Sequence, residues 1–204
     1  MRELKNGRTS FLEKNRFFIL LVGIMLGGVL IGALAYCSMN ENSVGTITIL
    51  TQGFIQTRAS SGTLNILINS LLSSTIPLLI VFILGFSAIS QPIELIIPFF
   101  KGLGLGASLA QIYAGSGLKG FIIIICLILP YAIITCFALI IAVREAIRFS
   151  SVLTEKALSD INNGGMKSTT RLYCIKFLVL EVIMIIGAIV DCICSFIFAG
   201  LLIK

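Results

Sequence analysis

The sequence contains no histidine and no tryptophan, and only 12% of its residues are charged. The absence of histidine excludes His-based catalytic triads, histidine general bases, and zinc or haem sites with histidine ligands. Without tryptophan, any aromatic belt at a membrane interface must consist of tyrosine and phenylalanine. Because soluble domains carry about 25% charged residues, this chain has too little charge to cover a surface that faces water.

Apolar side chains are in excess instead. Hydrophobic residues make up 57% of the 204 residues, and the mean hydropathy is +1.09. Each helical crossing of a bilayer takes about 20 apolar residues, so five or six crossings leave little chain for a soluble domain. The composition therefore predicts an all-α, polytopic transmembrane bundle of about five spans. We expect a single integral membrane domain over residues 1–204, in contact with lipid and with short amphipathic helices in its loops.

The longest runs without charge place the predicted spans. These runs lie near residues 17–36, 66–88, 93–112, 118–143 and 177–203. The third run is the weakest, because it contains Glu94, Pro98, Lys101 and several glycines. A re-entrant segment is therefore an alternative to a crossing at this place.

The basic residues predict the direction of the chain through the membrane. Eleven of the 15 lie in residues 1–16 and 144–176. Because cytoplasmic segments are enriched in Lys and Arg, both are predicted to be cytoplasmic, as a tail and a loop. A re-entrant third run would put six of these cations outside, so we expect five crossings in the cell membrane, with the amino terminus in the cytoplasm. The net charge of +6 is then a topology signal, and no nucleic-acid partner is expected because basic stripes with interleaved aromatics do not occur.

The two longest segments between spans also carry a helical pattern. In the outer loop, residues 38–63, Ile47, Leu50 and Phe54 recur at helical spacing and predict an amphipathic helix at the interface. Within the cytoplasmic loop, Leu153 and Leu158 belong to a similar pattern that predicts a helix continuing from the fourth span. A signal peptide cleaved after residue 35 is an alternative for the first run, but that run is about 17 residues, longer than the usual 7–15.

Four ionisable residues fall inside the predicted spans: Glu94, Lys101, Glu181 and Asp191. Such residues are costly in a bilayer and are functional candidates for that reason. Asp191 lies in the middle of its span, so it must be protonated, paired or next to a wet cavity, and Lys101 is its candidate partner. Both a structural pair and an ion or proton path stay open. No nucleophile–base pair stands out and the six cysteines form no CxxC, so we expect no catalytic residue, no cofactor and no metal site.

Glycines and a proline mark the other intramembrane features. Glycines four positions apart occur in the first and third runs, as Gly23, Gly27, Gly28, Gly32, Gly102 and Gly106. This spacing lets helix backbones approach closely, so these positions are predicted to pack helices together. Pro130, in the middle of the fourth run, lacks a backbone N–H and predicts a kink.

Several stretches of the chain resemble the stage II sporulation protein M family. They are Gly85-Phe86-Ser87-Ala88-Ile89-Ser90-Gln91-Pro92, Pro98-Phe99-Phe100-Lys101-Gly102-Leu103-Gly104-Leu105-Gly106, Gly117-Leu118-Lys119-Gly120, Leu129-Pro130-Tyr131 and Arg144-Glu145. The resemblance covers about residues 15–150, with the last span fitting the layout of the family. Many relatives have histidine or another polar residue after the central proline, and often glutamate five positions past it. Tyr131 and Thr135 stand there in this chain, which is typical of a divergent member.

The resemblance implies a non-enzymatic integral membrane protein of a Gram-positive spore former. Members of the family work in engulfment of the forespore, as the membrane anchor of a complex with two cell-wall hydrolases that remodel septal peptidoglycan. Cell-wall hydrolases are therefore the expected partners, and a homo-oligomer is left open. The alternative is a small transporter or channel with Asp191, Lys101 and Glu94 in a polar path.

Overall fold

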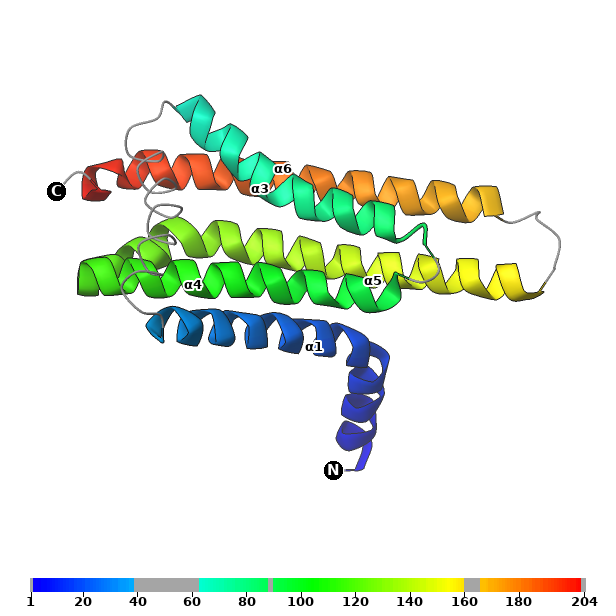
Figure 1. Cartoon of the computed structure of the whole chain (residues 1–204). Coiled ribbons are helices and arrows are strands. Elements are labelled where there is room, and N and C mark those ends of the chain that lie inside the picture. The colour runs from blue at the N-terminus through cyan, green and yellow to red at the C-terminus, as the bar shows by residue number, and fades with distance from the viewer. Residues whose placement is uncertain (1, 39–62, 88–89, 160–165, 203–204) are drawn as a thin grey trace.

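The computed structural model describes residues 2–38, 63–87, 90–159 and 166–202. The elements are α1 (Arg2–Cys37), α3 (Thr63–Leu84), α4 (Gln91–Ile123), the π-helical turn η1 (Ile124–Ile128), α5 (Leu129–Ser159) and α6 (Met166–Leu202). Successive helices run in opposite directions along one elongated bundle, with α1 beside α4 (Figure 1). The predicted all-α fold is confirmed for the described residues. The predicted amphipathic helix in the outer loop falls at residues 39–62, outside them.

Five stretches of these helices are long and apolar enough to cross a membrane. They are Arg16–Cys37, Leu67–Leu84, Gln91–Gly115, Gly120–Glu155 and Ser168–Ile197. Many large apolar side chains point outward along them, Leu34, Ile83 and Phe196 among the most exposed, as expected of helices that face lipid instead of water. The prediction of a five-span bundle is confirmed, and the chain is a multi-pass membrane helical protein.

The third run of the sequence forms a full-length helix. Its apolar stretch, Gln91–Gly115, has 25 residues, enough for a complete crossing, and α4 lies alongside α1 and α5 in the bundle (Figure 1). Pro92 lies in the first turn of α4, where its missing N–H removes no helical hydrogen bond. The structure thus has a crossing helix where the sequence left a re-entrant segment as an alternative.

Three helix boundaries differ from the predicted span limits. The second span was expected to reach residue 88, but α3 ends at Leu84 and a turn follows. The helix of the fourth span passes the predicted span limit at residue 143 and continues to Ser159, as the helical pattern around Leu153 and Leu158 predicted. The fifth was expected from residue 177, whereas α6 begins at Met166. Charged residues such as Lys176 do not end a helix, because a long side chain can place its charge outside the apolar layer.

The reversal between the third and fourth spans takes place at one glycine. Gly117 has φ 55° and ψ −129°, a backbone conformation open to glycine because it has no Cβ. Further on, η1 lies directly before Pro130, and the Leu129 N–H donates to the Ile124 carbonyl, five residues back. The sequence predicted a kink at Pro130, because in a regular α-helix the proline ring would collide with the carbonyl of residue 126. In the structure a π-helical turn occurs at this place.

Close packing of α1 on α4 depends on four of the six predicted glycines. A Cβ at Gly28 would collide with Phe99 O, and one at Gly32 with Leu103 O. In the reverse direction, a Cβ at Gly102 would collide with Met25 O. The two backbones therefore touch through reciprocal small-residue pairs, as in other membrane helix dimers.

The remaining predicted glycines differ. Gly106 belongs to the same contact, because a Cβ there would collide with Val29 O. Gly23 and Gly27, by contrast, have nothing within 4 Å of an added Cβ. In the described bundle these two glycines therefore do not pack α1 against another helix. They lie on a different face of α1 from Gly28 and Gly32.

Candidate functional site

A short run of hydroxyl side chains on α3 is the centre of the polar interior. We call Ser70, Ser73, Ser74 and Thr75 the α3 polar seam. Ser70 and Ser74 are buried, and the Ser74 hydroxyl donates to the Ser70 carbonyl at 2.8 Å, one turn back along its own helix. Hydroxyl groups in membrane helices donate either to a backbone carbonyl of their own helix or to a group on a neighbouring helix. The α3 polar seam contains both kinds of hydrogen bond.

Asp191 on α6 binds the seam at Ser70. Its side chain is fully buried, and the Ser70 hydroxyl donates to Asp191 Oδ2. The Ser70 carbonyl in turn accepts the Tyr131 hydroxyl from α5 at 2.9 Å. One serine therefore connects α3, α5 and α6, and Tyr131 takes part in this connection.

Lys101 on α4 binds the seam at a different residue. Its ammonium donates to the Ser73 carbonyl at 3.1 Å and lies 3.4 Å from the Ser73 hydroxyl. The sequence left open whether Lys101 pairs with Asp191. In the structure Lys101 contacts Ser73 of α3, and Asp191 contacts Ser70, one turn back along the same helix.

Glu181 and Glu94 complete the set of intramembrane candidates. Glu181 on α6 accepts the Thr75 hydroxyl at 2.7 Å, so three of the four ionisable residues bind the α3 polar seam. Glu94 is fully buried in the first turn of α4 and bonds to Ser90 of its own helix at 2.9 Å. The seam thus fastens α4, α5 and α6 to α3, with interhelical bonds of about 0.6–2 kcal/mol each in membrane proteins.

An aromatic cluster beside the end of α3 was not anticipated from the sequence. Tyr173 stacks between Phe149, with ring centroids 4.2 Å apart, and Phe82, at 5.4 Å. Its hydroxyl donates to the Phe82 carbonyl at 3.0 Å, and Gly85 leaves room for that hydroxyl because a Cβ there would collide with it. Aromatic residues near the ends of three predicted spans were the available signal, since such residues gather at membrane interfaces.

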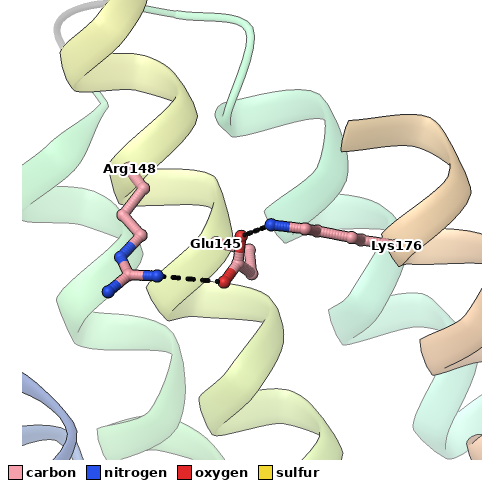
Figure 2. A network of polar contacts seen from close by, with 3 residues as sticks. All are labelled: Glu145, Arg148 and Lys176. Carbon is pink, nitrogen blue, oxygen red and sulfur yellow. Dashed lines mark hydrogen bonds and ion pairs between the residues drawn. The ribbon is translucent and has the colours of Figure 1, made fainter. Parts of the chain in front are cut away.

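Glu145 on α5 was also missed. It forms ion pairs with Lys176 of α6, at 2.5 Å, and with Arg148 one turn on, at 3.4 Å (Figure 2). Both cations are more than half exposed, so water screens the pairs and each contributes about 0–1 kcal/mol. Glu145 and Arg148 at i,i+3 are a recognisable helical pair, but their connection to α6 depends on tertiary structure.

No group of three or more His, Cys, Asp or Glu side chains that could hold a metal ion occurs within the described ranges. Asp191, Glu181 and Lys101 instead bond across helices to hydroxyl or carbonyl groups of the α3 polar seam. No protein-family model, curated protein or solved structure matches the chain.

Proposed function

We propose that the protein is a non-enzymatic membrane scaffold that anchors peptidoglycan hydrolases at the septal membrane, as the resemblance to the stage II sporulation protein M family implies. The observation that carries this proposal is the use of Lys101, Glu181 and Asp191 to bind α3. In a transporter, such charged side chains would bind the solute. In this protein they bond to a neighbouring helix. A bundle fastened in this way suits an anchor that presents a fixed surface to partners.

The orientation belongs to the same proposal. The end of α5 and the start of α6 lie at one end of the bundle, and α1 enters the bundle from the same side, with its first turns bent away from the other helices (Figure 1). The exposed cations Arg148, Arg171 and Lys176 belong to those parts of α5 and α6. Cation-rich ends of membrane bundles face the cytoplasm, which supports a cytoplasmic amino terminus and an outer position for the segment between α1 and α3.

The proposal makes the outer segment, residues 38–63, the contact region for the hydrolases. Replacing Phe54 and Arg58 together with alanine is expected to lower hydrolase recovery about tenfold or more, a loss of about 1.4 kcal/mol in binding. Large aromatic and arginine side chains are the residue types that dominate most interfaces. The measurement is peptidoglycan-degrading activity that co-purifies with the tagged protein from sporulating cells in mild detergent.

Gln56→Ala in the same segment is the matched control and should leave recovery unchanged. The amount of tagged protein in the membrane fraction normalises each sample. If a variant without residues 38–63 recovers as much hydrolase activity as the unaltered chain, recruitment does not use this segment and the proposed contact is wrong.

A small transporter or channel is the second candidate function. The observation in its favour is that two carboxyl side chains, Glu94 and Asp191, are fully buried within the bundle, since intramembrane acids mark proton and ion paths in many transporters. In this hypothesis Asp191, Lys101 and Glu94 line a polar path. It differs from the scaffold in requiring a measurable solute flux.

A further inference from the structure

The connection between α3 and α4 brings several oxygen atoms around one hydroxyl. Ser90 Oγ lies within hydrogen-bond distance of the Leu84 carbonyl, of the Ser87 carbonyl at 2.8 Å, and of Glu94 Oε1 at 2.9 Å. The Ser87 carbonyl also accepts the Ser150 hydroxyl from α5 at 2.8 Å. The end of α3, the start of α4 and the middle of α5 thus meet at Ser90.

The number of available protons restricts the charge of Glu94. A serine hydroxyl has one proton to donate, and backbone carbonyls only accept. The two carbonyls also accept other donors, Leu84 from the Ser87 N–H and Ser87 from the Ser150 hydroxyl, both at 2.8 Å. Where the Ser90 proton goes to a carbonyl, the contact with Glu94 needs a proton of its own. The only group that can supply it is the Glu94 carboxyl, as a neutral acid whose O–H donates to Ser90 Oγ.

The surroundings of Glu94 agree with a neutral acid. The side chain is fully buried, and Glu94 Oε2 has no hydrogen-bond partner among the described residues. An ionised carboxylate would need several donors or a cation in such a place. The Tyr173 hydroxyl of α6 lies beside Gly85 and donates to the Phe82 carbonyl at 3.0 Å. The turn after α3 contributes the Ser87 carbonyl, and α5 contributes the Ser150 hydroxyl.

We propose that Glu94 is a proton-binding site that fastens the start of α4 to the end of α3. With the proton bound, Glu94 donates to Ser90 and Ser90 donates to the Leu84 and Ser87 carbonyls. When the Glu94 O–H bond breaks, the proton passes to bulk water and the electron pair stays on the carboxylate. Ser90 then turns its proton to the new anion, and the Leu84 carbonyl keeps the Ser87 N–H as a donor, at 2.8 Å, but loses the bond from Ser90. The ligand of this site is a proton, and its release loosens the connection between α3 and α4.

Glu94→Gln is the decisive variant, because a glutamine amide keeps the shape and a neutral N–H donor for Ser90. We expect the variant to fold and, at mildly acidic pH, to match the melting temperature of the unaltered protein. Glu94→Ala, which has no donor, should melt lower. The folded state of the unaltered chain holds the Glu94 proton, whereas its unfolded state releases it, and Glu94→Gln has no proton to release. As pH rises, the folding constant of the unaltered chain should therefore fall relative to that of Glu94→Gln, by up to about tenfold per pH unit.

The measurements are unfolding of the full chain in detergent micelles over a pH series and an infrared difference spectrum between the unaltered protein and Glu94→Gln. The spectrum should contain the carbonyl band of a protonated carboxylic acid. Three results would overturn the proposal: a carboxylate band alone, identical pH dependence of the two proteins, or a Glu94→Gln variant that is as unstable as Glu94→Ala or does not fold.

Discussion

Replacing Tyr173 with alanine is expected to lower the free energy of unfolding by about 3–5 kcal/mol, the usual loss for a buried aromatic side chain. The Tyr173 ring is buried between Phe149 and Phe82, and it also contacts Phe177 at a centroid distance of 4.6 Å. Removing it leaves a cavity where α3, α5 and α6 meet. Unfolding in mixed micelles with a rising fraction of anionic detergent, followed by circular dichroism, measures the loss.

Tyr173→Phe is the matched control, because it keeps the ring and removes only the hydroxyl that donates to the Phe82 carbonyl. Its expected cost is about 1 kcal/mol, the net value of a typical hydrogen bond. Similar losses for the alanine and phenylalanine variants would show that ring stacking contributes little. The aromatic cluster would then not be a main source of stability.

Valine at Gly32 or at Gly106 is expected to destabilise the protein by about 1–3 kcal/mol or more, the range for overpacked interiors. A Cβ at Gly32 would collide with the Leu103 carbonyl, and one at Gly106 with the Val29 carbonyl. The obstacle in both cases is backbone, which cannot move aside as a flexible side chain can. The two helices must separate, so we expect lower melting temperatures and easier proteolysis of α1 in detergent.

Two neighbouring glycines provide the control for this prediction. A Cβ at Gly27 or at Gly104 meets nothing within 4 Å. Alanine at either position should be neutral or should stabilise by up to about 1 kcal/mol, because alanine is the better helix former. Equal losses at Gly27 and Gly32 would contradict the packing of α1 against α4 through one face.

The helical class and the number of spans could be predicted because both follow from composition. Scarce charge and long apolar runs specify helices that face lipid, with no knowledge of their neighbours. Packing faces could not be predicted so well. Gly23, Gly27, Gly28 and Gly32 form two consecutive GxxxG patterns, and only the second one contacts α4. The choice between them depends on the rotation of α1 about its axis, which its neighbour determines.

The polar site shows the same limit. The sequence identified Glu94, Lys101, Glu181 and Asp191 by their cost in a bilayer, and it offered Lys101 as a candidate partner of Asp191 on charge alone. Both instead bind hydroxyl-bearing residues of α3. Ser70, Ser73, Ser74 and Thr75 were visible as a cluster in the second span, and helix spacing would have placed several of them on adjoining faces. Which neighbour each one meets follows only from the packed bundle.

Ion flux through the purified protein in sealed liposomes tests most directly whether the intramembrane polar groups hold an anchor together or line a solute path. Asp191→Asn is the matched variant, since an asparagine oxygen can still accept the Ser70 hydroxyl. The scaffold proposal predicts that liposomes with the unaltered protein, with the variant or with no protein leak protons, sodium and potassium at the same rate. Flux that the unaltered protein accelerates and that Asp191→Asn abolishes would contradict it and establish a transporter or channel.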